Sequence, residues 1–362
     1  MIYFDHAATA MPTEQILTRY FDLVREFGGV NAESAHLLGQ RSRNALESSG
    51  RRLISLLKLP EKFELLWFPG TVPALAFVAE SFPNLTKEVR SSGLSHPSIP
   101  AIFKRCSGKY KEIKCDRNGA LQLPEADNAA ALAIFHQLQS EIGTKVDFST
   151  IRKAFPEAVI FSDSVQAAGK IQLPVEADLI LISGSKFGAP CGGAALLYNS
   201  ENTHLRDIQN LYRKWRSSDY RQDRLHVPEL LIIESALGAK MKSGFLEELK
   251  VGRINRFIRE NAVNFGARET IPVDLASPYI CHLNFPGFQG GVLARMFSEN
   301  GIMLSSGSAC AAESGEPSPA MRAIGFSREE AYSGLRLSFA ASNEESEARR
   351  FLQLLPEILK NY

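Results

Sequence analysis

The sequence predicts an α/β protein in which a large domain, with a mostly parallel sheet flanked by helices, is joined to a smaller α+β domain. Three observations support this prediction. Short apolar runs that end in Gly, Ser or Asp alternate with helix-like stretches through most of the chain. Polar residues collect directly after these runs, where open α/β sheets bind ligands. Near residue 245 the pattern changes, so we expect residues 13–245 to form the large domain and residues 1–12 with 246–362 to form the small one.

The apolar runs of the large domain predict its strands. The first run, FELLWF (63–68), is followed by a Pro-Gly-Thr turn and then by an apolar helix start. The later runs have the length and apolar content of strands that are buried on both faces. They are ALAIFHQL (131–138), AVIFSD (158–163) and DLILISG (178–184).

The smaller domain has a different pattern. A charged segment at 246–266 predicts a helix, and strands are expected at YICHLNF (279–285) and SGLRLSF (333–339). For the last helix, Ser342 and Glu345 have the spacing of a capping box. Its apolar face is predicted to contain Ala348, Phe351, Leu352 and Leu355.

Charge and composition exclude several classes of partner. The chain has 362 residues, and its 41 Lys and Arg against 40 Asp and Glu give a formal net charge of +1. Such a chain has no bulk field to attract nucleic acid or an anionic membrane. No apolar run approaches the length of a membrane span, and Asp5 and His6 interrupt the N-terminus before a signal-sequence core forms. We therefore expect a cytoplasmic protein that binds neither nucleic acid nor membrane.

The cysteines predict free thiols. Their number is odd and no C-x-x-C pair occurs, which argues against a disulfide framework and against a thiolate zinc site. The spacing of the histidines does not suggest a metal site either. The cysteines are Cys106, Cys115, Cys191, Cys281 and Cys310.

Two stretches after predicted strands contain residues that can carry chemistry. Lys186 follows DLILISG; alone it is more often a solvated loop residue, but a partly desolvated amine there can form a Schiff base. Asp163 ends an earlier strand, with Gln166 three residues later. Such an Asp is most often a helix cap, but pyridoxal phosphate (PLP) needs a carboxylate to keep its pyridine nitrogen protonated. The order Asp-x-x-Gln, then Ser-x-x-Lys, is a stronger signal for PLP than either part alone.

The sequence resembles the class V aminotransferase family of fold-type I PLP enzymes, and within it the NifS-like group I cysteine desulfurases. The likeness runs nearly from end to end, and its specificity comes from the order and spacing of short pieces. These pieces are YFDHAATAMPT at the start, GGVNAESAHLLGQRSRNALE (28–47), SHPSIP (95–100), QSEIGTKVDF (139–148), SDSVQAAGK (162–170), SGSKFG (183–188) and the long stretch at 301–339.

The resemblance implies a role for each matching residue. Lys186 would hold PLP covalently and later move the substrate Cα proton. Asp163 would pair with the pyridinium, and Gln166 would hydrogen-bond the ring hydroxyl. His96 would stack on the ring and assist proton transfer. Arg336 would bind the substrate carboxylate, a task that suits a planar bidentate donor.

The resemblance also assigns a role to Cys310. In the family, the cysteine of S-S-G-S-A-C is the nucleophile that takes sulfur from the substrate, and Cys310 occupies this position. A thiol attacks as the thiolate, a form that access and nearby positive charge favour. Cys106 and Cys281 fit the alternative role of a small buried residue better, since Cys281 lies within an apolar strand.

Four stretches depart from the family pattern. Ser185 stands where the family has His, and GTVP replaces a G-A-T-E turn, leaving Thr71 and backbone N–H groups to bind phosphate. QSE replaces N-N-E, so Ser140 or Gln139 must supply a contact normally made by Asn. Arg224 replaces a threonine that reaches the phosphate of the neighbouring subunit. Beside the residues already named, the predicted cofactor contacts are Gly70, Thr71, Ser140, Ser183, Ser185 and Arg224.

The resemblance implies a PLP-dependent cysteine desulfurase that converts L-cysteine to L-alanine, leaves a persulfide on Cys310 and passes the sulfur to an acceptor protein. One alternative is another class V PLP enzyme, such as a selenocysteine lyase or an aminotransferase. A second is a non-catalytic scaffold, which the retained set of site residues argues against. We expect a homodimer because Arg224 makes sense as a phosphate ligand mainly across a subunit boundary, and because two-fold pairs are the commonest oligomers.

Overall fold

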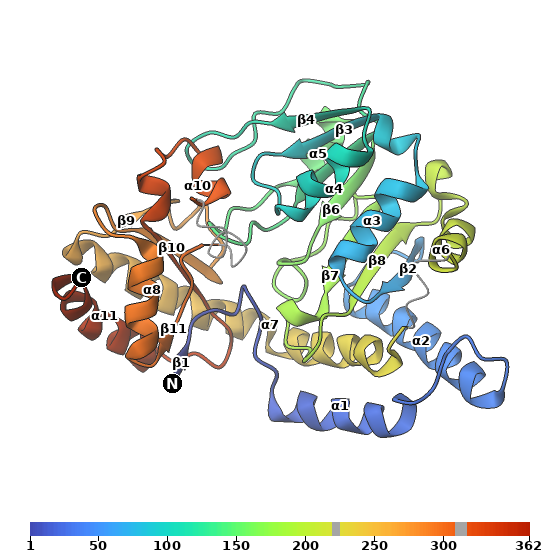
Figure 1. Ribbon diagram of the computed structural model, residues 1–362, viewed down its shortest axis with the longest axis horizontal. Coiled ribbons are helices and arrows are strands. Elements are labelled where there is room, and N and C mark those ends of the chain that lie inside the picture. Colours follow the sequence, from blue (N-terminus) through green and yellow to red (C-terminus); the bar gives the residue numbers. More distant parts are fainter. Residues whose placement is uncertain (219–224, 308–316) are drawn as a thin grey trace.

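The computed structural model describes residues 1–218, 225–307 and 317–362, so the predicted site residues Arg224 and Cys310 lie outside the described residues. Its centre is a seven-stranded sheet with the order β2-β8-β7-β6-β5-β3-β4 (Figure 1). From β7 to β4 the neighbouring strands are parallel, whereas β8 is antiparallel to β2 and β7. The strands are β2 (Phe63–Phe68), β3 (Glu88–Ser92), β4 (Lys109–Ile113), β5 (Leu132–His136), β6 (Val159–Asp163), β7 (Leu179–Ser183) and β8 (Ala194–Asn199).

Helices cover both faces of this sheet. Alternate residues of each central strand belong to different hydrophobic cores: Phe135 packs on one face and Ile134 on the other. Burial on both faces explains why the strands are nearly continuous apolar runs in the sequence. One face is covered by α1 (Glu14–Phe27), α2 (Leu37–Leu56), α5 (Phe148–Ala154) and the first half of α7 (Val227–Ala262). The other is covered by α3 (Thr71–Ser81), α4 (Ser98–Cys106) and α6 (Ile208–Arg216).

A separate core lies around an antiparallel three-stranded sheet with the order β12-β10-β9. The start of the chain joins this core, because β1 (Ile2–Tyr3) pairs with β11 (Ile302–Met303) and Phe4 is buried in it. The other elements of this part are β9 (Arg268–Glu269), β10 (Ile280–Asn284), β12 (Gly334–Ser338), α8 (Gly290–Glu299), α10 (Pro319–Ala323) and α11 (Glu345–Lys360).

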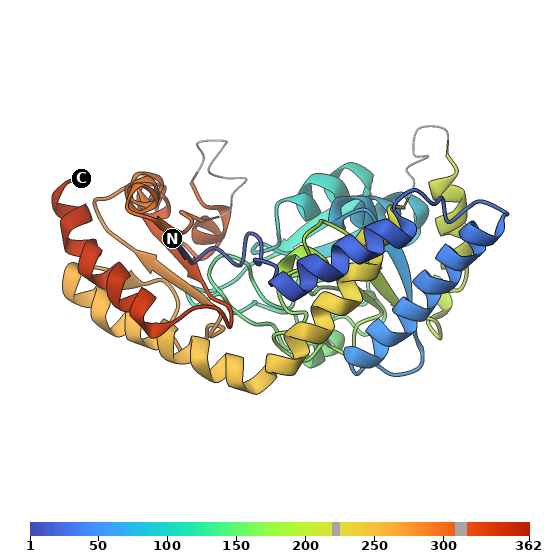
Figure 2. The ribbon, with the colours of Figure 1, turned by 90° about the horizontal axis from the view of Figure 1, so that it is seen from below.

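Helix α7 connects the core on one face of the large sheet with the core of the small sheet. Its first half packs in the core of the large sheet and its second half, including Ile254 and Ile258, in the core of the small one. Figure 2 shows the helix running beneath both parts of the molecule. The predicted boundary at residue 245 falls beside Gly244, where the backbone leaves helical geometry (φ 32°, ψ −122°). The division into two domains itself stays a prediction.

The predicted strands and the apolar face of the last helix are confirmed, but the predicted cap is wrong. All four residues predicted for that face are buried in α11. The helix begins at Glu345, and its capping box is formed by Glu344 and Glu347. Ser342 instead lies in a turn that Asn343 closes, since the Asn343 N–H donates to the Ala340 carbonyl at 3.0 Å.

No helix within the described ranges has both the length and the apolar character needed to cross a membrane.

The bend in α7 generates a prediction about stability. Gly244→Ala should lower the free energy of unfolding by about 1 kcal/mol or more, because an L-residue is strained at this positive φ. Gly252→Ala is the matched control in the same helix: its Cβ would meet Pro278 at an ordinary 3.5 Å. That change should instead stabilise by about 0.5 to 1 kcal/mol. Urea denaturation of the two variants measures both effects, and equal midpoints would contradict the prediction.

Candidate active site

One cavity of about 600 Å³ lies where β5, β6 and β7 end. His136, Asp163 and Ser183, the last residues of these strands, all line it. This is the edge of an open α/β sheet where ligands bind. Every predicted site residue in the described part of the chain lines this cavity: Gly70, Thr71, His96, Ser140, Asp163, Gln166, Ser183, Ser185, Lys186 and Arg336.

Lys186 enters the cavity from the turn after β7. The turn is tight, because a Cβ added at Gly184 would lie 2.8 Å from the Cβ of Ala189. The Lys186 amine donates a hydrogen bond to the main-chain carbonyl of Ala8. The hydroxyls of Ser183 and Ser185 lie 3.2 Å apart on the same turn. The amine is therefore held at the cavity by the N-terminal segment of the chain.

Asp163 and His96 form an electrostatic pair within the cavity. Burial raises the pKa of Asp163, while His96 and Lys186 oppose the shift. Burial lowers the pKa of His96, and Asp163 opposes that shift. The Nδ1 atom of His96 lies 2.8 Å from the Ser98 hydroxyl and accepts the N–H of Ser98 at 3.3 Å, contacts that favour the neutral tautomer with its proton on Nε2. A cationic N–H group bound beside Asp163 would offset the cost of burying this carboxylate.

The residues at the start of α3 give the cavity a place that can accept an anion. Gly70 is the N-cap residue of α3, and as a glycine it has no side chain that could accept hydrogen bonds. The first N–H groups of the helix therefore have no capping side chain as an acceptor. A helix N-terminus of this kind binds phosphate through its N–H groups and its dipole. The hydroxyls of Thr71, Ser183 and Ser185 line the same cavity. With the amine of Lys186 and the carboxyl of Asp163, this donor set fits PLP.

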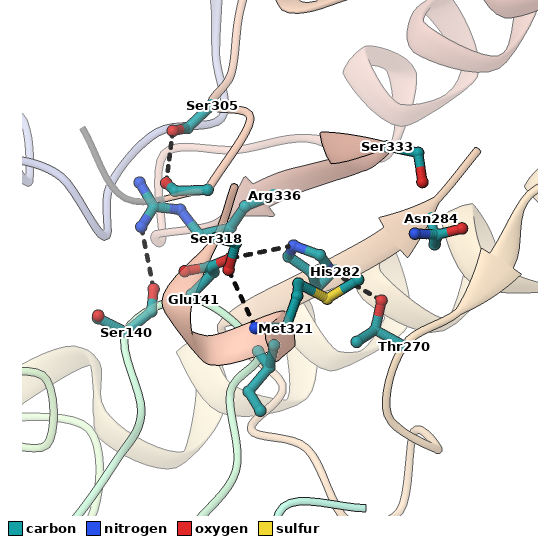
Figure 3. A network of polar contacts seen from close by, with 12 residues as sticks. Ser140, Glu141, Thr270, His282, Asn284, Ser305, Ser318, Met321, Ser333 and Arg336 are labelled. Carbon is teal, nitrogen blue, oxygen red and sulfur yellow. Dashed lines mark hydrogen bonds and ion pairs between the residues drawn. The ribbon is translucent and has the colours of Figure 1, made fainter. Parts of the chain in front are cut away.

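Arg336 lies on β12 and brings the small sheet to the cavity (Figure 3). Its Nη2 donates to the Asp5 carboxylate at 2.7 Å, and its Nη1 donates to the Ser140 carbonyl at 3.0 Å. The guanidinium is buried, and its Nε has no hydrogen-bond partner among the described residues. A carboxylate that reached Nε would satisfy this donor.

Next to Ser140, Glu141 forms a buried polar network (Figure 3). The hydroxyl of Ser318 donates to Glu141 Oε1, and His282 Nε2 lies 3.8 Å from the same atom. The backbone of Gly307 lies close to this carboxyl, since a Cβ there would be 3.1 Å from Oε1. Burial raises the pKa of Glu141. The network joins the cavity segment to residues that precede and follow the stretch containing Cys310.

Ser140 and Gln139 were the two residues expected to supply the contact that the family makes with Asn, and Ser140 is the one whose side chain is available for it. Oε1 of Gln139 accepts the N–H groups of Glu141 and Ile142 at 2.6 and 2.7 Å, and its Nε2 lies 3.5 Å from the Leu94 carbonyl. The Gln139 amide therefore stabilises the turn. Both residues line the cavity.

Several residues of the site were missed by sequence reasoning. Asp5, Ala7 and Ala8 lie in a stretch that carried the family resemblance, but their contacts link segments that are far apart in the chain. His136 ends an apolar strand and lines the cavity; both of its ring nitrogens are buried without a hydrogen-bond partner among the described residues. Within those residues, no cluster of three or more His, Cys, Asp or Glu could hold a metal ion.

Comparison with known proteins identifies the family. Residues 2–212 and 263–351 match the aminotransferase class-V family, so the chain belongs to this family. It is 26% identical to a cysteine desulfurase of Gluconacetobacter diazotrophicus, covering 99% of this chain and 93% of the relative. It is 22% identical to a putative cysteine desulfurase NifS of Halalkalibacterium halodurans, covering 99% of this chain and 98% of that relative.

Solved structures share the fold. A NifS-like protein superposes with a TM-score of 0.84 at 20% identity and covers all of both chains. A NifS-like protein from Rickettsia africae gives 0.83 at 19% identity, with 99% of each chain covered. These similarities confirm the predicted fold class, a fold-type I transferase architecture with a mostly parallel sheet between helices.

The burial of His136 generates a prediction about pH. Burial lowers the pKa of His136 from 6.5 to about 4. Between these values the unfolded chain binds a proton that the folded chain does not, so stability falls as the pH falls through this window. His136→Met removes this contribution. When the pH is lowered from about 7 to about 5, the free energy of unfolding of the variant should fall by about 2 kcal/mol less than that of the wild type.

Urea denaturation of the cofactor-free protein at the two pH values measures this difference. His204→Met, at an exposed histidine, is the control. Parallel pH profiles for wild type and His136→Met would contradict the prediction.

Proposed function

We propose that the protein is a PLP-dependent cysteine desulfurase that converts L-cysteine to L-alanine and transfers the sulfur to Cys310. The observation that carries this proposal is the grouping of Lys186, Asp163 and His96 in one cavity with Arg336. The names of the family relatives support the substrate, since several are named cysteine desulfurases. A solved structure with the same fold, SspA, is described in complex with cysteine.

Each residue would have one task. When bound, PLP supplies an electron sink for the charge that forms at the substrate Cα. Lys186 Nζ would take the Cα proton, and His96, which lines the same cavity, would assist proton transfer through its Nε2–H. Asp163 would keep its negative charge by pairing with the ring N–H. Arg336 would orient the substrate through its carboxylate.

Cys310 lies outside the described residues, and its role as nucleophile is a proposal from the sequence. In the step, a new S–S bond forms between the Cys310 thiolate and the substrate sulfur while the substrate C–S bond breaks. The electron pair of the C–S bond stays with the carbon fragment, which takes up a proton and leaves as alanine. The sulfur remains on Cys310 as a persulfide, so carbon is reduced, sulfur is oxidised and no external oxidant is needed.

The direct test is to identify both products. The purified holoenzyme should form alanine from L-cysteine, and mass spectrometry should find one added sulfur on the peptide that contains Cys310. Cys310→Ser should bind PLP as wild type does, yet form almost no alanine, because the acceptor thiol is gone. The matched control replaces the other four cysteines together and should keep most activity.

The other outcomes identify the alternatives. Alanine from selenocysteine but not from cysteine would favour a selenocysteine lyase. Bound PLP without added sulfur would favour an aminotransferase. A protein that binds no PLP would favour a scaffold, and added sulfur on a different peptide would move the nucleophile away from Cys310.

We also propose a homodimer. An apolar cavity lined by Trp67, Phe68, Trp215 and neighbouring residues shares Pro69 and Val72 with the candidate active site. Exposed apolar side chains occur at the start of α2, where Leu37 is 82% exposed. Surfaces of this kind mark contacts with other chains. Arg224, the residue expected to reach the partner's phosphate, lies outside the described residues.

Sedimentation of the holoenzyme tests this proposal. A dimer is expected, and Leu37→Glu should weaken it because a charge would be buried at the contact. Arg224→Ala should lower PLP occupancy without changing the fold. A monomer with full PLP occupancy would contradict the proposal. A cytoplasmic location and a protein as the final sulfur acceptor stay predictions from the sequence.

A further inference from the structure

Lys170 touches the active site through Gln166. Its Nζ donates to Oε1 of Gln166 at 3.1 Å. Gln166 is 4% exposed, and its Nε2 donates to the Ala7 carbonyl at 2.6 Å. Gln166 lines the candidate active site, whereas Lys170 lines a different cavity of about 410 Å³. Lys170 therefore contacts Gln166 without being a lining residue of the candidate active site.

The chemistry of the two neighbours determines the orientation of the Gln166 amide. A lysine ammonium can only donate hydrogen bonds, and a main-chain carbonyl can only accept them. The amide oxygen must therefore face Lys170 and the NH₂ group must face Ala7. An NH₂ group has two hydrogens and Ala7 takes one. The second N–H remains for the cavity that Gln166 lines.

Lys170 belongs to a buried charged cluster. Lys240 pairs with Glu247, which also accepts the Ser243 hydroxyl at 2.6 Å. Both lysines lie over the Tyr279 ring, with Nζ to centroid distances of 5.8 Å for Lys170 and 4.8 Å for Lys240. The cluster therefore combines two lysine amines with one carboxylate.

The hydrogen bond to Gln166 does not depend on the charge of Lys170. Burial lowers the pKa of Lys170 to about 7, with further lowering by Lys240, Lys186 and Arg336 and an opposing effect of Glu247. The nearby His6 is buried and its pKa is lowered to about 4, so this ring is neutral. A neutral amine still has N–H groups to donate. A neutral amine can also accept, but the Ala7 carbonyl still takes an N–H of Gln166, so the amide keeps the same orientation on both sides of the titration of Lys170.

We propose that Lys170 is a positioning residue: it fixes the Gln166 amide so that an N–H, rather than the carbonyl oxygen, faces the bound cofactor. This inference rests on the proposed function, because the group that receives the N–H is the ring oxygen of PLP. That oxygen is an acceptor when it is deprotonated, and a donor directed at it stabilises this form. A Gln166 amide turned the other way would place two acceptors against each other.

The test is a pH titration of the visible absorption band of the holoenzyme without substrate. In Lys170→Met the Gln166 oxygen loses its donor, which leaves the Ala7 carbonyl as the one described contact that opposes rotation of the amide. The N–H is then directed less well at the ring oxygen, and the deprotonated form of this oxygen is less stabilised. The midpoint should rise by about one pH unit. Gln166→Leu is the reference and should shift the midpoint in the same direction. Lys170→Gln keeps a donor without the charge and should return the midpoint close to that of wild type.

The matched control replaces Lys240 by Met and Glu247 by Gln together. It removes one positive and one negative charge from the cluster, and neither residue has a described hydrogen bond to Gln166. Its midpoint should stay at the wild-type value. An equal shift in this control and in Lys170→Met would mean that any disturbance of the cluster moves the midpoint, whether or not the hydrogen bond to Gln166 is lost, which overturns the proposal. An unshifted Lys170→Met would also overturn it.

Two further results complete the test. A wild-type protein without a visible band contradicts the proposed function itself, so the two failures are distinguishable. If Lys170→Met does not fold, wild-type protein with ¹⁵N-labelled glutamine gives the answer. One side-chain N–H proton of Gln166, assigned with Gln166→Leu, should move downfield when PLP is added. An unchanged resonance would overturn the proposal.

Discussion

The site depends on the N-terminal segment 5–8, which passes between the two sheets and is bound to both. Asp5 pairs with Arg336 of the small sheet, and the N–H of Ala7 donates to the Ser338 hydroxyl at 2.8 Å. On the other side, the carbonyls of Ala7 and Ala8 accept from Gln166 and Lys186 of the large sheet. The N-terminal residues thus fix the distance between the groups proposed to hold the cofactor and the one proposed to hold the substrate.

The buried charges of Arg336 and Asp163 favour the binding of ligands that carry the opposite charge. Arg336 is 3% exposed, and a buried guanidinium without a partner would cost several kcal/mol. Asp5 supplies that partner, while Nε of Arg336 is left for a second carboxylate. Asp163 is in the opposite situation, because burial raises its pKa and a cationic partner would lower it again. Substrate and cofactor would each satisfy a charge that the fold has already buried.

Sequence reasoning succeeded where local signals were strong. Buried strands such as β7 (Leu179–Ser183) are nearly continuous apolar runs because helices cover both faces of the sheet. It failed where the outcome depends on tertiary contacts. Ser342 has a good capping sequence, but a turn closed by Asn343 starts the helix two residues later with Glu344 as the cap. The ion pair between Asp5 and Arg336 joins segments that are far apart in the chain, which a single sequence cannot indicate.

The central claim is that Lys186 holds PLP at the cavity where β5, β6 and β7 end. The most direct measurement is borohydride reduction of the holoenzyme, which fixes a lysine-bound cofactor permanently, followed by mass spectrometry of the peptides. The account predicts the added mass of reduced PLP on the peptide that contains Lys186, and its loss in Lys186→Ala. Label on the peptide of Lys170 or Lys240 instead, or on no peptide of a protein that binds PLP, would contradict it.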